Sequence, residues 1–197
     1  MRLGVEVILL MCAAIAGYAL LSIYFPYLAD AAQFYLLLAV ACTVAIVLLE
    51  HSFPIEKPPR WIMEAAAYSY TAMMLTAMAF MLLHSALGYA FKYVVTLTLA
   101  EQAMAVVYFL LVALGEDLFT YGLPLALEKR TPLGKGVYLV FLGLFAALHY
   151  PAYGNLMMLL QPFCAACFNM YIVKKYRNVA GPIIGHWLTD VCLVVLA

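Results

Sequence analysis

Long apolar runs separated by short polar breaks dominate the sequence. The runs lie at about 4–25, 33–50, 64–88, 93–114, 137–150, 155–173 and 181–197. Each is long enough, or nearly so, to cross a hydrocarbon layer about 30 Å thick as a helix. The pattern predicts an all-α fold, a polytopic transmembrane helical bundle with about seven to eight membrane helices. No soluble-length segment separates the runs, so we expect one integral membrane domain over residues 1–197.

Two adjacent acids, Glu116 and Asp117, interrupt this pattern. The segment 116–127 that they open is otherwise apolar, but it is shorter than the roughly 20 residues of a spanning helix. We expect it either to enter the membrane and return or to form a short helix that leans on its neighbours. An ionised side chain costs about 2.5 kcal/mol or more at mid-depth in lipid. The acidic pair therefore marks a candidate functional site.

The composition agrees with a membrane protein. Of the 197 residues, 69% are hydrophobic and 10% are charged, whereas soluble domains carry about 25% charged residues. The formal net charge is zero, which leaves no basic field for nucleic acid. We therefore expect partners in the lipid bilayer or at its surface. The five cysteines, among them Cys164 and Cys167, lie in apolar stretches and are interpreted as packing residues.

Basic residues are distributed unevenly between the breaks. If 116–127 makes no net crossing, only Lys92 falls on one side of the membrane. The other side then receives the remaining basic residues, which are Arg2, Lys57, Arg60, Lys129, Arg130, Lys135, Lys174, Lys175 and Arg177. By the positive-inside rule that side is cytoplasmic, with the N-terminus inside and the C-terminus outside. Residues 3–25 are interpreted as a retained first span rather than a signal peptide.

Few other ionisable residues lie inside the apolar runs. His149 ends one run, and His186 and Asp190 stand four residues apart in the last, which puts them on one helix face. We hypothesise that Glu116, His149, His186 and Asp190 converge from three helices on one polar cavity. There they would supply bases, a proton carrier and hydrogen-bond donors. The alternative is that they only join helices through hydrogen bonds.

Three smaller assignments follow from the same runs. His84 is interpreted as a hydrogen-bonded packing residue. Glu101 is left open between helix packing and the wall of a cavity. Gly181 and Gly185 have the GxxxG spacing, which would let His186 lie close to another backbone.

The order of the polar residues resembles the CAAX protease and bacteriocin-processing family, also called the ABI family of intramembrane endopeptidases. That family carries EExxxR followed by glycine, then FxxxH, then HxxxN or HxxxD. The resemblance covers about residues 95–197, and the first three spans carry no motif. The matching positions in this sequence are Glu116, Asp117, Gly122, Phe145, His149, His186 and Asp190.

The resemblance implies a role for each matched residue. Glu116 takes the place of the glutamate that activates the attacking water. His149, four residues after Phe145, takes the place of the partner base. His186 and Asp190 take the places of residues that help to stabilise the oxyanion. A metal-free peptide hydrolysis without a cofactor follows from these roles.

Tyr121 is the main departure from the family pattern. The second acid and the arginine of EExxxR can pair as ions one helix turn apart, whereas Asp117 and Tyr121 offer only a phenol hydrogen bond at that spacing. Two neighbouring acids without a nearby cation are not expected both to be ionised in an apolar site. The alternatives are an altered pH optimum, a cation supplied by Lys129 or Arg130, and an inactive relative.

Other functions use the same residues. His149, His186 and Asp190 would also suit zinc with an open fourth position, and Glu116 would then be the base of a zinc-dependent membrane hydrolase. The same residues could also line a proton or ion pathway. They could equally belong to a family member that catalyses no reaction.

The leading prediction is an enzyme, an intramembrane endopeptidase of CAAX-protease type. Its expected substrates are membrane-associated or lipidated peptides, and the resemblance leaves open a prenylated CAAX protein, a bacteriocin leader and a membrane regulator. The resemblance implies a protein integral to the plasma membrane of a prokaryote.

Overall fold

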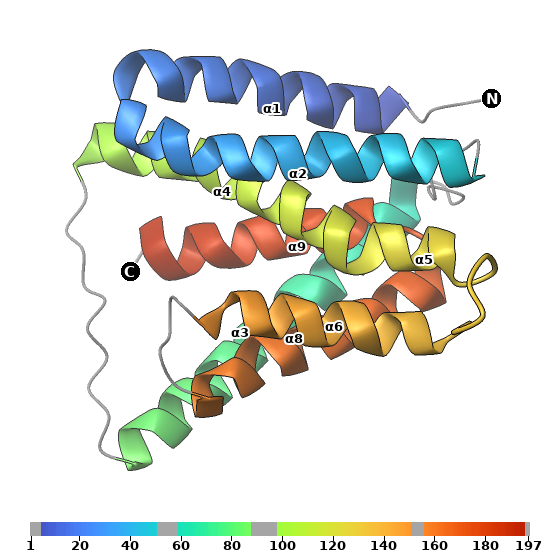
Figure 1. Ribbon diagram of the computed structural model, residues 1–197. Helices are drawn as coiled ribbons and strands as arrows, with labels where there is room; N and C mark the ends of the chain where they lie inside the picture. Colours follow the sequence, from blue (N-terminus) through green and yellow to red (C-terminus); the bar gives the residue numbers. More distant parts are fainter. Residues whose placement is uncertain (1–4, 51–58, 88–97, 151–155, 196–197) are drawn as a thin grey trace.

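The computed structural model describes residues 5–50, 59–87, 98–150 and 156–195. These residues form helices joined by short turns and contain no β-strand. The predicted all-α fold is therefore confirmed for the described part of the chain. In chain order the elements are α1 (Val5–Tyr24), α2 (Pro26–Glu50), α3 (Pro59–Ala86), α4 (Leu99–Asp117), the π-helical turn η1 (Leu118–Gly122), α5 (Leu123–Leu127), α6 (Gly136–Leu148), α8 (Leu156–Tyr176), α9 (Ala180–Asp190) and the π-helical turn η2 (Val191–Val195) (Figure 1).

Three helical stretches of the described residues are long and apolar enough to cross a membrane. They are Ala32–Leu49, Trp61–Ala86 and Leu99–Leu127. Shorter apolar helices cover Ile15–Tyr24 and Gly136–Leu148. The helical, membrane-spanning character of the chain follows from these stretches, while the number of seven to eight spans and the orientation stay predictions.

The segment 116–127 is neither a re-entrant loop nor a separate short helix. It continues α4 through η1 into α5, and the whole stretch Leu99–Leu127 is one candidate span. The backbone N–H of Leu123 donates to the carbonyl of Leu118, five residues earlier, so η1 contains one wide turn. The two alternatives expected for 116–127 do not describe it, because Gly115, Glu116 and Asp117 lie inside α4 and the helix continues beyond them.

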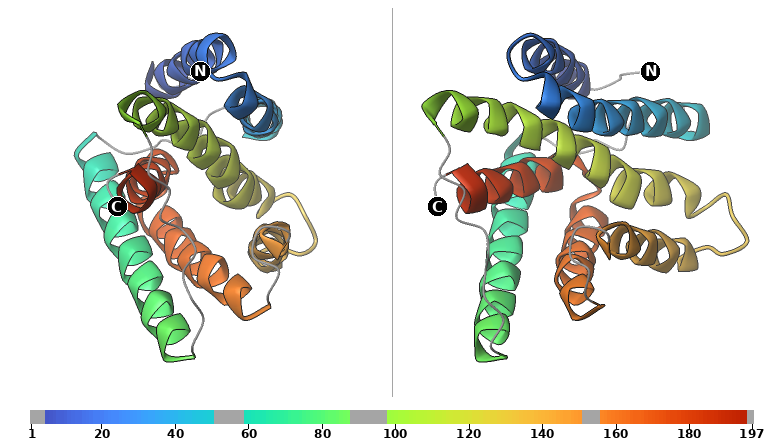
Figure 2. Two further views of the ribbon diagram at one scale, coloured as in Figure 1. Left: turned by 90° about the vertical axis from the view of Figure 1, so that its left-hand side faces the viewer. Right: turned by 60° about the vertical axis from the view of Figure 1, so that its left-hand side comes forward.

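The helices α4 and α9 lie in the middle of the bundle. α1 and α2 pack on one side of α4, and α9 packs on another. α9 also contacts α3 and α8, while α6 packs along α8. Figure 2 shows the same order from two further directions, with α9 between α4 and the α3–α8 pair. Residues on facing sides of α4 and α9 are therefore enclosed by other helices.

Two glycines bring α9 close to α3. A Cβ atom on Gly185 would lie 2.5 Å from Ser69 Cβ and 2.7 Å from the carbonyl oxygen of Ala66. A Cβ atom on Gly181 would lie 2.5 Å from Ala65 Cβ. The close approach predicted from the GxxxG spacing is confirmed, and it fixes the position of the residue after Gly185, which is His186.

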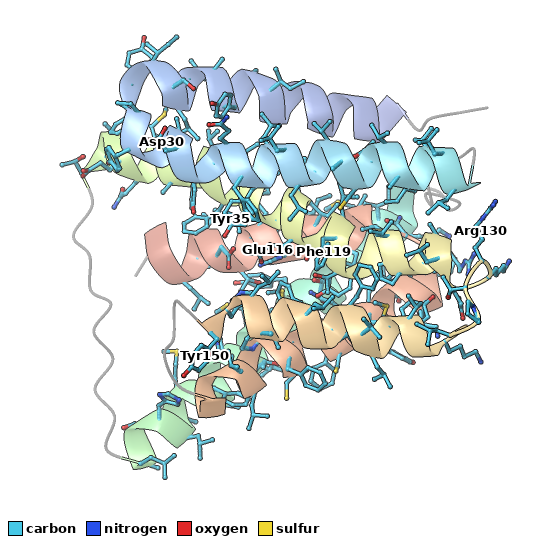
Figure 3. The ribbon with its side chains drawn as sticks, in the orientation of Figure 1. Asp30, Tyr35, Glu116, Phe119, Arg130 and Tyr150 are labelled. Carbon is cyan, nitrogen blue, oxygen red and sulfur yellow. The ribbon has the colours of Figure 1, made fainter. Side chains whose placement is uncertain are left out.

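The ends of α5, α6 and α8 meet on one side of the bundle. Lys174 lies 4.0 Å from a carboxylate oxygen of Glu128 and 4.4 Å from the centre of the Tyr138 ring. The Tyr138 hydroxyl donates to Glu128 at 2.7 Å. Lys129 and Arg130 are exposed at this end, where Figure 3 labels Arg130. Several residues of the predicted cytoplasmic side are thus gathered together.

Candidate active site

Three predicted acids from two helices surround the imidazole ring of His186. α4 ends with Glu116 and Asp117, and α9 carries His186 and, one turn later, Asp190. Asp117 is fully buried and 7% of the His186 surface is exposed. Because α9 is held against α3 by its glycines, the ring of His186 is directed towards the end of α4.

Asp117 orients the His186 ring. Its Oδ1 atom lies 3.0 Å from His186 Nδ1. An ionised carboxylate can only accept in such a bond, so with Asp117 ionised Nδ1 carries the proton and donates. A histidine whose one nitrogen donates to a carboxylate is fixed in both ring orientation and tautomer. Asp117 therefore determines what the opposite nitrogen, Nε2, presents to the cavity.

The Nε2 side of His186 faces two further acids. Asp190 Oδ2 lies 3.4 Å from Nε2, and Glu116 Oε2 lies 3.9 Å from it. Lys129 and Arg130 are exposed at the end of α5, so they do not pair with these buried acids. Within the described residues, His186 is the group able to carry positive charge that contacts all three carboxylates. The idea that Lys129 or Arg130 supplies the cation is therefore wrong.

A cavity of about 160 Å³ lies beside this cluster. It is large enough for several water molecules. Glu116, His186 and Asp190 line it from α4 and α9, and Phe145 and His149 line it from the end of α6. The hypothesis that three helices bring these side chains to one polar cavity agrees with this geometry. Their chemical roles belong to the proposal below.

The ring of His149 is fixed by its own helix. Its Nδ1 atom lies 2.8 Å from the carbonyl oxygen of Phe145, which can only accept, so Nδ1 donates. The Phe145 ring packs edge-on against His149 with the ring centres 4.5 Å apart. In a neutral His149 the proton then resides on Nδ1, and Nε2 is the basic nitrogen.

A second cavity adjoins the first and has a different lining. Its volume is about 270 Å³. Glu116, Phe145 and His149 line both cavities. The remaining lining of the second cavity comes from α2, η1 and α6, and consists of Phe34, Tyr35, Leu38, Phe119 and Leu148. The candidate base thus stands at the boundary between a polar and a largely apolar space.

Tyr121 fills the position where the family carries arginine. It is buried in η1 and lines the polar cavity. Its hydroxyl lies beside Asn169 of α8, whose Nδ2 donates to the sulfur of Met73. Asp117 Oδ2 is buried and has no hydrogen-bond partner among the described side chains. The phenol bond expected between Tyr121 and Asp117 is therefore not formed.

Glu101 has a role that neither sequence interpretation included. Its carboxylate accepts from the backbone N–H and from the hydroxyl of Thr98, both at 2.8 Å, while its own backbone N–H donates to Thr98. This reciprocal arrangement caps the start of α4. His84 is buried, as its interpretation as a packing residue requires.

Tyr35 and Asn169 are site residues that sequence reasoning missed. Tyr35 belongs to α2 and lines the apolar cavity beside Glu116. Figure 3 shows Tyr35 and Glu116 near the centre of the bundle. Asn169 is a fully buried amide in α8. A polar residue inside the apolar run 155–173 could have marked it as a candidate site residue. A tyrosine in an apolar run gives no comparable signal, because it is common in cores and at membrane interfaces.

Comparison with known protein families identifies the part of the chain that carries this site. Residues 98–192 match the Rce1-like family. The family is described as Type II CAAX prenyl endopeptidase Rce1-like, and the match covers 95 of the 197 residues. The resemblance indicated by the three motifs is thus confirmed over the Rce1-like region, residues 98–192. Comparisons with curated proteins and with solved structures gave no significant match.

The Rce1-like region contains Glu116, His149, His186 and Asp190. Its family implies a membrane-integral protease with a peptide substrate. Tyr35 lies outside the region, in α2.

The cysteine and metal predictions have different outcomes. Cys42, Cys164, Cys167 and Cys192 are free thiols, in agreement with their interpretation as packing residues. The described residues hold no group of three or more His, Cys, Asp or Glu side chains arranged for a metal ion. This geometry does not favour the zinc set His149, His186 and Asp190, and the metal-free mechanism stays a proposal.

Proposed function

We propose that the protein is an intramembrane endopeptidase that hydrolyses peptide bonds with water activated by Glu116 and His149. The observation that carries the proposal is that one cavity is lined by both of these side chains and by the His186–Asp190 pair. Peptide hydrolysis needs a base, a proton donor for the leaving amine and donors for the oxyanion. The cavity gathers groups suited to each task from three helices.

In the proposed reaction Glu116 takes a proton from a water molecule in the polar cavity. The oxygen of that water bonds to the carbonyl carbon, and the electron pair of the carbonyl moves to its oxygen. When the tetrahedral intermediate collapses, the C–N bond breaks and the amine nitrogen receives a proton from Glu116. His149, with its basic Nε2, helps to bind the water and to exchange the proton. The products are a carboxylic acid and an amine.

His186 is the proposed donor to the oxyanion. With Nδ1 held by Asp117, a protonated His186 directs an Nε2–H bond towards the cavity, where negative charge develops on the carbonyl oxygen. Asp190 lies 3.4 Å from the same nitrogen in the structure. A bound carbonyl would therefore compete with Asp190 for this donor, and a protonated Asp190 would itself donate.

The apolar cavity suggests the class of substrate. Phe34, Leu38, Phe119 and Leu148 line it immediately beside Glu116. Such a surface suits an apolar side chain or a lipid group near the cleaved bond, because burying apolar area contributes about 25 cal/mol per Å². A membrane-associated or lipidated peptide fits this requirement.

The test is cleavage of candidate peptides by purified protein in lipid vesicles. Glu116→Gln and His149→Ala should each lower the cleavage rate by at least about 100-fold. Glu128→Gln is the matched control, because Glu128 is an acid of the same helical stretch that binds Tyr138 and Lys174 outside the cavity. Full cleavage by Glu116→Gln would refute the proposal. Proton or ion flux without cleavage would favour the pathway alternative.

Metal dependence is tested separately. Metal analysis of the purified protein and cleavage before and after chelation distinguish the two hydrolytic mechanisms. The metal-free mechanism predicts unchanged cleavage after chelation. A stoichiometric zinc ion whose removal abolishes cleavage would overturn it.

Tyr121→Arg tests whether this chain needs its tyrosine. Arginine would restore the family residue beside the unpartnered Asp117 oxygen, but it would replace the phenol that lines the polar cavity. A large loss of cleavage would show that tyrosine is a working replacement. A gain would show that the tyrosine impairs the site.

A further inference from the structure

The base proposed for catalysis is held by a helix outside the Rce1-like region. Tyr35 of α2 lines the apolar cavity together with Glu116 and His149. Both side chains therefore face the same space, and the Tyr35 hydroxyl interacts with the Glu116 carboxylate across it. Glu116 therefore has a neutral donor on the α2 side and the ring of His186, 3.9 Å away, on the α9 side.

The contact depends on an unusually close approach of two backbones. A Cβ atom on Gly115 would lie 2.7 Å from the carbonyl oxygen of Tyr35 and 3.2 Å from its Cα. Because Gly115 has no side chain, α2 and α4 touch at the residue before Glu116. The Tyr35 ring also packs edge-on against Tyr108 of α4, with ring centres 6.3 Å apart. These two contacts fix the direction in which the hydroxyl points.

The other titratable groups around Glu116 do not duplicate this interaction. Asp117 and Asp190 are acids and raise the electrostatic cost of a second negative charge. His186 divides its contacts among three carboxylates. His149 lines the same cavities and is held by Phe145. Among the described residues that line the apolar cavity, Tyr35 is the one that carries a neutral hydroxyl.

We propose that Tyr35 is a positioning residue for Glu116. Its hydroxyl donates to the carboxylate, fixes it between the polar and the apolar cavity and stabilises the ionised form that accepts a proton from water. The N-terminal helices thus complete the site of the Rce1-like region. The catalytic consequence rests on the proposed endopeptidase function, whereas the bond and its effect on ionisation do not.

Labelling with dicyclohexylcarbodiimide tests ionisation without any substrate. This apolar reagent modifies protonated carboxyl groups, and mass spectrometry of the modified peptide measures the reaction at Glu116 as a function of pH. Tyr35→Phe keeps the ring and removes the donor. We expect the pH at which labelling is half-maximal to be higher by about 1 in Tyr35→Phe, since a hydrogen bond to an ionised group is lost.

Two control variants make the labelling specific. Tyr108→Phe removes a hydroxyl from the same aromatic contact and should label as wild type does. Glu116→Gln should abolish the signal at position 116 and separate it from that of Asp117. An unchanged labelling midpoint in Tyr35→Phe, or an equal rise in Tyr108→Phe, would overturn the proposal. Thermal unfolding of each purified variant verifies that the fold is retained.

Cleavage kinetics give the second measurement. In Tyr35→Phe, kcat/KM should fall about fivefold at the pH where wild type is half-active on its acidic side, and it should recover as pH rises. A loss of the same size at every pH would indicate a merely structural role and would contradict the proposal. If wild type cleaves no peptide while the labelling midpoint still rises, the proposed function fails and the role of Tyr35 stands.

Discussion

Gly185→Ala is expected to displace the helix that carries His186. The new Cβ atom would lie 2.5 Å from Ser69 Cβ and 2.7 Å from the Ala66 carbonyl oxygen. Ordinary contact begins at about 3.4 Å, so α9 would have to move away from α3 by about 0.9 Å. Part of this clash involves backbone, which cannot rotate away. Overpacking of this kind costs about 1–3 kcal/mol of unfolding free energy.

The same displacement should reduce cleavage more than stability. His186 follows Gly185 directly, and a misplacement of about 1 Å can cost about 100-fold in rate. Gly143→Ala is the control, because a Cβ atom on Gly143 of α6 would meet nothing within 4 Å. It should be neutral or stabilise by up to about 1 kcal/mol.

Thermal unfolding and peptide cleavage of the purified variants measure both effects of Gly185→Ala. The reasoning is refuted if Gly185→Ala unfolds and cleaves like Gly143→Ala. It is also refuted if Gly185→Ala is destabilised but cleaves at the wild-type rate, since the position of His186 would then be insensitive to the contact between α9 and α3.

Three further predictions concern single side chains. Thr98→Ala should lower the unfolding free energy by about 1 kcal/mol through loss of the α4 cap, with cleavage unchanged, as measured by chemical unfolding and a peptide assay. Asp117→Asn should keep the fold but lower kcat by at least about 100-fold, because His186 loses the carboxylate that fixes its tautomer; wild-type kcat would contradict this. Tyr138→Phe should cost about 1 kcal/mol in thermal unfolding, since the hydrogen bond to Glu128 is lost.

Much of the site could be predicted from the sequence because ionisable residues are costly in lipid and therefore rare. Glu116, His149, His186 and Asp190 stand out against the apolar runs, and their order indicated the family. The packing between α9 and α3 also followed from two glycines four residues apart. A polar side chain that is unusual for the apolar sequence around it can therefore be recognised as a candidate site residue before the fold is known.

The wrong or missing predictions concern residues whose neighbours in space could not be inferred from the adjacent sequence alone. The segment 116–127 was set apart from the run 93–114 because it opens with two acids and is short, although Gly115 between them lies inside α4 and admits a neighbouring backbone. Glu101 was judged by its apolar neighbours alone, while Thr98, three residues earlier, completes a capping box. Tyr35 could not be found because its role depends on which helix packs against Gly115.

The wide turn of η1 makes this segment sensitive to length. Its i to i+5 bond encloses one residue more than an α-helical turn would. Deleting a single residue between Leu118 and Gly122 would let the helix close as an ordinary α-helical turn, and the buried residues Pro124, Leu125 and Ala126 would stay close to their places. Adding a residue there would instead rotate everything after it by about 100° relative to Glu116 and move these side chains out of the core. The segment 118–127 therefore tolerates the loss of one residue better than the gain of one.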